Sequence, residues 1–455
     1  TMQFEGYNAL YVPGWDCHGL PIEWQIEKQY RKKGKKKEDI DIKDFRNECR
    51  EFAQKWIEEQ KSSFIRLFVL ADWNKPYTTM AYESEAIILK EFSKFFLNGS
   101  LYQGSKPVMW SPIEKTALAE AEIEYHDIDS TSIYVAFQVK NSPNKLLENT
   151  SIVIWTTTPW TIPGNRAIAF GDSIDYCIFK VQESKNNFIK DNKYLVAKSL
   201  LEEVCERCDI NKFEIVREIK GEELGNTICH HPFSKIGFDY DVPLLKAAFV
   251  EDSEGTGFVH IAPCYGEDDY YLALDNNIVI KDIVKDDGCY RDNTPVFAGI
   301  HVFKAHLSVI ETLEEQNKLL GSREYRHSYP HSWRSKKPII YRTTPQWFIS
   351  MKSNNLKDKA LQGIEDTKWI PKSSKNRIQS MVENRPDWCV SRQRAWGVPL
   401  TIFINKNTGE PLKDEKVMER IIEDVKRNGS DVCLLYTSDA ADEGLGVDLG
   451  GRRII

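Results

Sequence analysis

Residues 151–163 read SIVIWTTTPWTIP, a β-branched run that ends in three threonines and carries two prolines after them. Val, Ile, Thr and Trp favour strands, whereas proline interrupts them. Three other runs share this character and are separated by clusters of Asn, Asp, Gly and Pro: SIYVAFQV (132–139), YCIFKV (176–181) and KYLVA (193–197). These runs predict a β-rich region from about residue 131 to 258.

The regions on either side of these runs have helical periodicity. Residues 83–96 predict a helix that stops at Asn98-Gly99, and residues 309–319 predict another. Residues 10–12 (Leu-Tyr-Val) predict a short strand. Residues 41–66 predict an amphipathic helix with a packed apolar stripe, formed by Phe45, Cys49, Phe52, Ala53, Trp56, Ile57 and Phe64. We therefore expect an α/β domain interrupted by a β-rich one.

Length and charge limit the possible functions. A chain of 455 residues is expected to form two or three packed domains. Its 61 basic and 68 acidic side chains give a net charge of −7, so no global positive field attracts nucleic acid. Phosphate binding would have to be local, at the basic runs 31–37 or 372–377. Each run is equally typical of a solvated loop or helix end.

Hydropathy and cysteine usage indicate a soluble cytoplasmic protein. No run approaches the roughly 18 to 20 apolar residues of a membrane span, and the first residues have no features of a secretory signal. The ten cysteines are scattered, unlike those of a small secreted domain. Cys205 and Cys208 have C-x-x-C spacing, but no second pair follows at zinc-ribbon distance. We expect two ordinary helix cysteines.

The threonine block is the first candidate site. Thr156, Thr157 and Thr158 present three hydroxyls where a strand ends before Pro159. Strand propensity alone would explain a single threonine at this position. It explains three consecutive threonines before Pro-Trp less well.

The segment GTGFVHIAPCYGEDDY (255–270) is the second candidate. It places His260 at the end of a strand and Asp268 and Asp269 at the start of a helix. A structural histidine and helix-capping carboxylates would explain these residues equally well. Together the two blocks predict a polar pocket of hydroxyls, an imidazole and a carboxylate, suited to holding an ammonium-bearing ester while water attacks. Neither block contains a P-loop or a nucleophile elbow.

Six motifs, in the same order, resemble class I aminoacyl-tRNA synthetases of the isoleucine, valine and leucine group. The match covers roughly residues 5 to 430. In valine and leucine members the threonine block usually reads Thr-Thr-Arg-Pro, so Trp-Thr-Thr-Thr-Pro-Trp favours isoleucine here. The motifs are GWDCHGLPIE (14–23), KPVMWSP with TALAEAEIEY (106–125), WTTTPWTIPGNRA (155–167), GTGFVHIAP with EDDY (255–270), YPHSWRSKKPIIYRTTPQWF (329–348) and DWCVSRQRAWGVPL (387–400).

The resemblance implies a partial Rossmann-type catalytic domain (1–130 and 326–432) interrupted by an inserted β-barrel editing domain (131–325). The implied parent is a monomer that charges tRNA(Ile) with isoleucine, using ATP and Mg²⁺, and hydrolyses valyl-tRNA(Ile). Asp16 would pair with the amino group of isoleucine in the synthetic pocket. The residues implied to line the editing pocket are Thr156, Thr157, Thr158, Asn165, His260 and Asp269.

By the same analogy each editing residue has a role. Asp269 would anchor the ammonium group of a misplaced valine. Thr157 and Thr158 would position the terminal adenosine or the attacking water, and His260 would contact the ribose or its ester.

Three departures from the family pattern qualify this picture. The ATP-binding signatures His-x-Gly-His and Lys-Met-Ser-Lys-Ser are expected before residue 1 and beyond the end, so the chain is expected to be an internal fragment that does not activate an amino acid alone. Ser332 and Ser335 stand where many relatives carry zinc-binding cysteines, so no zinc is predicted there, although His327 and His331 remain. Residues 433–455 have no family counterpart and are interpreted as a non-native, adapter-derived tail.

Two other functions stay open. A non-catalytic tRNA-binding or assembly module would bind tRNA in a salt-dependent way without deacylating it. A stand-alone editing hydrolase is disfavoured, because it would not need the synthetic-domain segments 1–130 and 330–430.

Overall fold

The computed structural model describes residues 2–405 and 408–433. The chain divides into two compact units. One, the β unit, is Ser105–Pro345, and the other, the flanking unit, combines Thr1–Gly104 with Gln346–Ile455. β3 (Leu101–Ser111) and β15 (Ile340–Ile349) carry the chain across the two boundaries. Of the predicted adapter-derived tail only Cys433 is described, and the rest lies outside the described residues.

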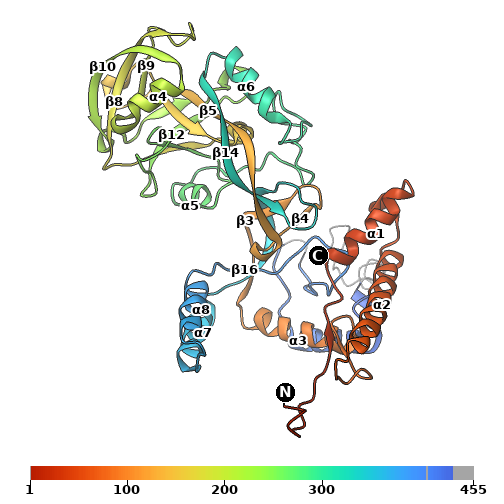
Figure 1. Cartoon of the computed structure of the whole chain (residues 1–455). Helices are drawn as coiled ribbons and strands as arrows, with labels where there is room; N and C mark the ends of the chain where they lie inside the picture. Colours follow the sequence, from red (N-terminus) through yellow and green to blue (C-terminus); the bar gives the residue numbers. More distant parts are fainter. Residues whose placement is uncertain (1, 406–407, 434–455) are drawn as a thin grey trace. The chain divides into compact units, whose positions relative to one another are not determined.

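The β unit is built around one large sheet, which confirms the β-rich prediction (Figure 1). Its order is β10-β8-β9-β6-β13-β7-β12-β11-β5-β14, and a further pairing of β5 with β6 closes the central strands into a ring. The strands are β5 (Ile123–Asn141), β6 (Thr150–Thr156), β7 (Ala167–Phe170), β8 (Asp175–Ser184), β9 (Lys193–Ala197), β10 (Ile210–Lys220), β11 (Ile228–His230), β12 (Asp241–Lys246), β13 (Phe258–Ile261) and β14 (Leu319–Ser332). The short β4 is Thr116–Ala117.

The helices of the β unit lie outside this sheet. Figure 1 shows α5 (Glu267–Asp275) and α6 (Ala305–Glu315) at its periphery, and α4 is Leu201–Arg207. The helix predicted over 309–319 therefore starts and ends earlier, because the chain is already in β14 at Leu319.

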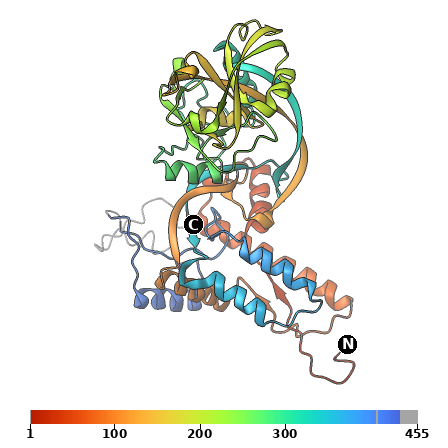
Figure 2. The same cartoon turned by 90° about the vertical axis from the view of Figure 1, so that its left-hand side faces the viewer.

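β5 and β14 form a long antiparallel ribbon that both views show bending away from the rest of the sheet (Figures 1 and 2). Ser130 pairs with Tyr325 and Thr131 with Glu324. The predicted domain limits at 131 and 325 therefore fall at neighbouring positions on this ribbon. The compact unit itself extends further, to residues 105 and 345.

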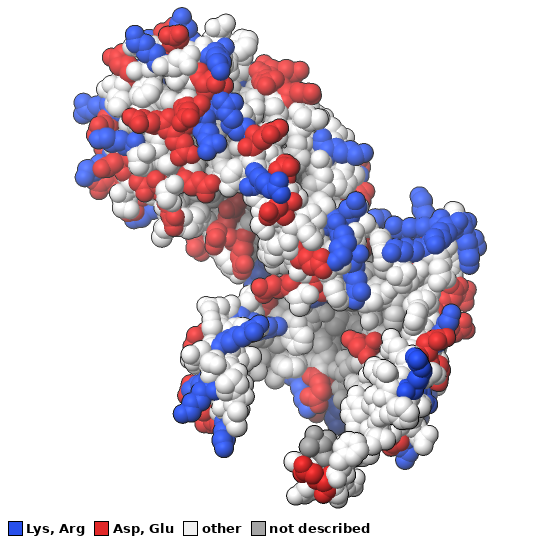
Figure 3. Space-filling model, in the orientation of Figure 1, with Lys and Arg blue, Asp and Glu red and all other residues white. Residues whose placement is uncertain are grey.

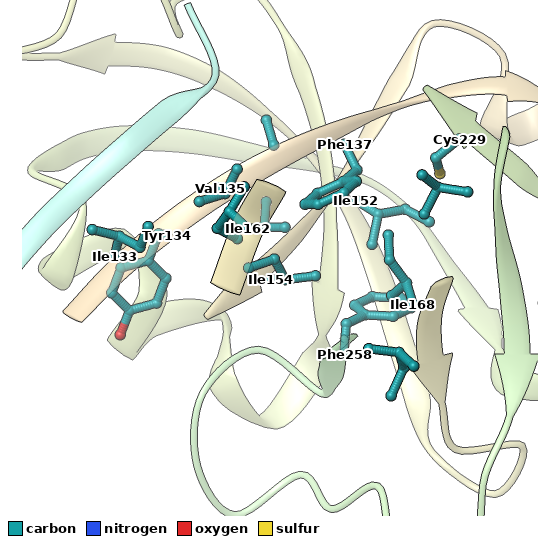
Figure 4. Close-up of a cluster of buried hydrophobic side chains, with 14 of the residues drawn as sticks. Ile133, Tyr134, Val135, Phe137, Ile152, Ile154, Ile162, Ile168, Cys229 and Phe258 are labelled. Atoms are coloured by element: carbon teal, nitrogen blue, oxygen red, sulfur yellow. The ribbon is translucent and has the colours of Figure 1, made fainter. Parts of the chain in front are cut away.

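The core of the β unit fills the space inside the ring of strands. Figure 4 shows Val135, Ile154, Ile162 and Ile168 pointing toward one another from β5, β6, the turn after β6 and β7. All four are fully buried. Each such side chain contributes roughly 1.5–3 kcal/mol by leaving water. This core fixes the ends of β6 and β13, where the candidate residues lie.

The flanking unit is mainly helical. The predicted helices are confirmed as α2 (Ile42–Arg66) and α3 (Tyr82–Leu97), with Asn98 as the C-cap of α3. The other helices are α1 (Leu20–Lys32), α7 (Leu356–Asp366), α8 (Ser373–Glu383) and α9 (Glu415–Asn428), and the short strands are β1 (Gly14–Trp15), β2 (Tyr77–Thr78) and β16 (Trp388–Cys389). Within the described residues, none of the helices has the length and apolar character that a membrane crossing needs.

Two predictions for the flanking unit were wrong in detail. The stripe of α2 is narrower than expected, because Trp56 and Phe64 are exposed while Phe45, Cys49 and Ala53 are buried. Residues 10–12 form no strand and their side chains are exposed. The strand begins two residues later, at Gly14, where Gly14 and Trp15 pair with β2.

Candidate functional site

The threonine turn begins where β6 ends, at Thr156. The next element, η4, is a 3₁₀ turn over Pro159–Gly164, and proline suits its first position because it has no N–H to leave unpaired. The Thr158 amide donates to Thr156 Oγ1 over 3.1 Å, and the two hydroxyl oxygens lie 3.2 Å apart. The turn thus brings the hydroxyls of Thr156 and Thr158 within hydrogen-bond distance of each other.

Thr161 is a site residue that the sequence predictions missed. Its hydroxyl donates to the Thr158 carbonyl over 2.8 Å and lies 3.0 Å from His260 Nε2. A 3₁₀ turn aligns residues three apart, so Thr158 and Thr161 share one side of it. The sequence could have indicated Thr161, because it lies three positions after Thr158 and between Pro159 and Pro163.

His260, on β13, is held by two hydrogen bonds. Asn165 Nδ2 donates to the Ala167 carbonyl over 2.9 Å, which fixes the orientation of the amide. The same NH₂ group lies 2.7 Å from His260 Nδ1, so Nδ1 accepts and Nε2 carries the proton that is donated to Thr161. Burial lowers the pKa of His260 to about 3, so the imidazole is neutral at physiological pH.

Asn165 does not line the pocket, contrary to the prediction. Its side chain is fully buried and lies behind His260. It contributes by fixing the tautomer and ring orientation of His260.

Side chains from distant segments hold the backbone of the turn. Tyr290 donates its hydroxyl to the Trp160 carbonyl, His231 lies 3.0 Å from the Ile162 carbonyl, and Tyr240 donates to the Asn165 carbonyl over 2.9 Å. The Ile162 carbonyl also accepts from the Asn165 amide over 3.0 Å, so these side chains add to the backbone hydrogen bonding of the turn. The hydroxyls of the turn are consequently presented in one fixed arrangement.

Asp269 is the third residue of α5, close to the N-terminus of the helix, as predicted. Its Oδ2 accepts a hydrogen bond from the Ala262 amide over 2.7 Å. Burial raises the pKa of Asp269 to about 6, with a smaller contribution from the negative charge of Asp268, although the Ala262 amide opposes the shift. A buried carboxylate that is costly to ionise gains strongly from a cationic partner.

These residues face one pocket of about 400 Å³, which we call the threonine pocket. Glu251 and Glu254 contribute exposed acidic side chains to its wall, and Trp155 contributes an aromatic one. The predicted residues that line the pocket are Thr156, Thr157, Thr158, His260 and Asp269, joined by Thr161. The combination of hydroxyls and carboxylates suits a cationic, hydrogen-bonding ligand.

Asp16 belongs to the flanking unit, just after β1. Its Oδ1 accepts a hydrogen bond from the Thr79 hydroxyl over 3.2 Å, and the residue is exposed. Its role toward isoleucine remains a prediction.

Neither cysteine of the C-x-x-C pair reaches solvent. Cys205 lies in α4, Cys208 caps that helix, and both pack in the core of the β unit. The hydroxyl of Ser332 donates to Glu114, and so does the backbone amide of Ser335. Within residues 2–405 and 408–433, no three His, Cys, Asp or Glu side chains gather as a metal site requires.

Charge is distributed differently over the two units. On the β unit, acidic and basic side chains are interspersed (Figure 3). In the flanking unit, basic side chains gather at the end of α1, where Arg31, Lys32, Lys33, Lys35 and Lys36 are all exposed (Figure 3). We call residues 31–37 the basic segment.

Comparisons with known proteins give the family. Residues 1–440 match the family model described as tRNA synthetases class I (I, L, M and V). The chain is 52% identical over 444 residues to the isoleucine–tRNA ligase of Pelagibacter ubique (strain HTCC1062), an alignment that covers 98% of this chain and 48% of that protein. It is 48% identical over 446 residues to the isoleucine–tRNA ligase of Gluconobacter oxydans (strain 621H), covering 94% of this chain and 46% of that protein. The chain spans about half the length of the curated relatives it matches. Because the family model matches almost the whole sequence, the chain belongs to the class I tRNA synthetases of the isoleucine, leucine, methionine and valine group.

Proposed function

We propose that the chain is part of a cytoplasmic isoleucine–tRNA ligase and that the part of its β unit from residue 131 to 325 is the editing domain, which hydrolyses valyl-tRNA(Ile). The names of its relatives support the ligase assignment. In this proposal ATP and Mg²⁺ serve the charging reaction of the whole protein, with Asp16 facing the amino group of isoleucine. Residues 131–325 form the editing domain, and residues 1–130 and 326–432 belong to the synthetic domain.

A second pocket is needed because valine is smaller than isoleucine by one methylene. A hydrophobic pocket gains only about 1–3 kcal/mol from that group, a general figure for which isoleucine enzymes are the standard case. A hydrolytic pocket that admits valine but excludes isoleucine supplies the missing discrimination.

One observation carries the proposal: the Asp269 carboxylate and the threonine hydroxyls face the same 400 Å³ pocket. An aminoacyl ester has an ammonium group two bonds from its carbonyl carbon. Asp269 would bind that ammonium, and this ion pair would lower the pKa of Asp269 again. Asp269 is therefore an anchor rather than a proton acceptor once the substrate is bound.

The neutral His260 holds Thr161 through Nε2–H and has no free nitrogen to accept a proton. Its contribution is positional, because it fixes Thr161 and, through the Thr158 carbonyl, the turn. The hydroxyls of Thr157 and Thr158 would orient the terminal adenosine, the ester or the attacking water. Water adds to the ester carbonyl, the ribose oxygen leaves with a proton, and valine and tRNA are released.

Deacylation of valyl-tRNA(Ile) by the full chain tests the proposal, with Asp269→Ala as the site variant. Asp268→Ala is the matched control, because it removes the adjacent carboxylate, which is exposed. We expect hydrolysis by the unchanged chain and by Asp268→Ala, and a loss of at least about 100-fold for Asp269→Ala. A folded chain that binds tRNA but does not hydrolyse the ester would instead support the non-catalytic module.

A further inference from the structure

An aromatic ladder follows one face of β14. Tyr325, His327, Tyr329 and His331 alternate along the strand, so their rings share a face. Successive ring centroids are 5.3, 5.7 and 6.1 Å apart. At the Tyr325 end of the ladder, the Tyr325 and Trp155 rings pack edge to face, with their centroids 5.5 Å apart. The ladder lies entirely within the β unit.

The two ends of the ladder differ. Tyr329 donates its hydroxyl to the Ile339 carbonyl and His331 is buried, so this end is packed interior. At the opposite end, Trp155 lines the threonine pocket, and Tyr325 donates its hydroxyl over 3.2 Å to Glu254, which also lines it. Trp155, Tyr325 and His327 are half-buried. The solvent-accessible part of the ladder is therefore continuous with the pocket wall.

We propose that Trp155, Tyr325 and His327 form a stacking platform for the unpaired nucleotides that precede the terminal nucleoside of an RNA 3′ end. This inference rests on the proposed function, in which the ester at that terminal nucleoside occupies the pocket. The strand leaving the pocket must then pass its wall as single-stranded RNA. Every base has a π-face, so aromatic rings accept such nucleotides without reading their sequence.

Charge favours contact through the bases. Glu251 and Glu254 are exposed and line the same pocket, where they would repel phosphates. A bound strand would therefore turn its bases toward the aromatic rings and its phosphates toward solvent. The hydrogen bond from Tyr325 to Glu254 shows that the phenol ring lies beside this acidic part of the pocket wall.

Two substrates separate the platform from the pocket. Valyl-tRNA(Ile) carries the preceding nucleotides, whereas valyl-adenosine carries only the terminal nucleoside. Removing one stacking ring typically weakens nucleotide binding about 5- to 100-fold. We expect Tyr325→Ala and His327→Ala in the full chain to raise KM for valyl-tRNA(Ile) by that factor, and to change kcat/KM for valyl-adenosine less than twofold. Tyr325→Phe, which keeps the ring, should behave nearly as the unchanged chain does.

Tyr125→Ala is the matched control. Tyr125 lies on the same ribbon and is 61% exposed, but it pairs with Pro330 and so points to the opposite face. Its replacement should leave both substrates unaffected. Equal losses on both substrates, equal effects of Tyr125→Ala and Tyr325→Ala, or no loss at all would overturn the platform.

A binding measurement keeps this test independent of hydrolysis. Fluorescence anisotropy with a short single-stranded RNA should show the same 5- to 100-fold weakening for Tyr325→Ala and none for Tyr125→Ala. If the unchanged chain hydrolyses neither ester, the proposed function fails, and the anisotropy result alone decides the platform. Equal affinities of the two variants for this RNA would refute it.

Discussion

Replacing Asp269 by asparagine should abolish deacylation and at the same time stabilise the β unit. The pKa of Asp269 rises from 3.8 to about 6 in the folded protein because burial disfavours its charge. Each pKa unit corresponds to about 1.4 kcal/mol, so ionising Asp269 in the fold costs up to about 3 kcal/mol at neutral pH. Asparagine keeps an oxygen to accept the hydrogen bond from Ala262 and carries no charge.

The sign of the pH dependence follows from the raised pKa. Well below pH 3.8 the carboxyl is protonated in both the folded and the unfolded chain, so it causes no ionisation penalty. As pH rises from 3.8 to about 6 the unfolded chain ionises first, and folding stability falls relative to that of the asparagine variant. Above about pH 6 the penalty is constant. The benefit of Asp269→Asn should therefore be nearly complete at pH 7 and fall to about a fifth of that value at pH 4.

Thermal unfolding of the full chain at pH 7 and pH 4 measures this effect. A gain of 1–3 kcal/mol in a unit of this size corresponds to about 2–12 °C in Tm at pH 7. Asp268→Asn, one residue away and exposed, should shift Tm by less than about 2 °C. A lower Tm for Asp269→Asn at pH 7, or a gain that is equally large at pH 4, would show that burial does not penalise the charge of Asp269.

The kcat/KM for valyl-tRNA(Ile) should fall about tenfold per pH unit below about pH 6, because a protonated Asp269 cannot pair with the ammonium group. A flat pH–rate profile from about pH 5 to 7 would contradict this prediction. Asn165→Ala should lower the free energy of unfolding by about 1–3 kcal/mol and slow deacylation, because it leaves His260 Nδ1 buried without a partner. Denaturant titration measures the first effect and single-turnover rates measure the second. An unchanged rate would show that the orientation of His260 does not matter for the reaction. Replacing Lys35 and Lys36 in the basic segment by glutamine should reduce the slope of log affinity for tRNA against log salt by about 1 to 2, whereas an unchanged slope would mark the segment as merely solvated.

The sequence predicted those parts of the site that local patterns control. The threonine block ends a strand, and Asp269 starts a helix, because β-branched runs, prolines and helix-terminal carboxylates act within a few residues of themselves. The helix over residues 42–66 was equally accessible, since its apolar period is long and regular.

Features that depend on tertiary contacts were not accessible in this way. Asn165 was expected to face the pocket, but its partner His260 is 95 residues away in the chain, and this partner determines where the amide points. Thr161 joins the site only because η4 is a 3₁₀ turn held by donors from distant segments. At residues 10–12 the strand propensity of Leu-Tyr-Val has no neighbouring strand to pair with, and the local preference alone forms no strand.

The rates at which the full chain hydrolyses valyl-tRNA(Ile) and isoleucyl-tRNA(Ile) decide whether the threonine pocket is an editing site. The threonine pocket predicts that the valyl ester is hydrolysed at least about tenfold faster and that Asp269→Asn removes this hydrolysis. Equal rates for the two esters, or undiminished hydrolysis by the Asp269→Asn variant, would contradict the assignment of the pocket as an editing site.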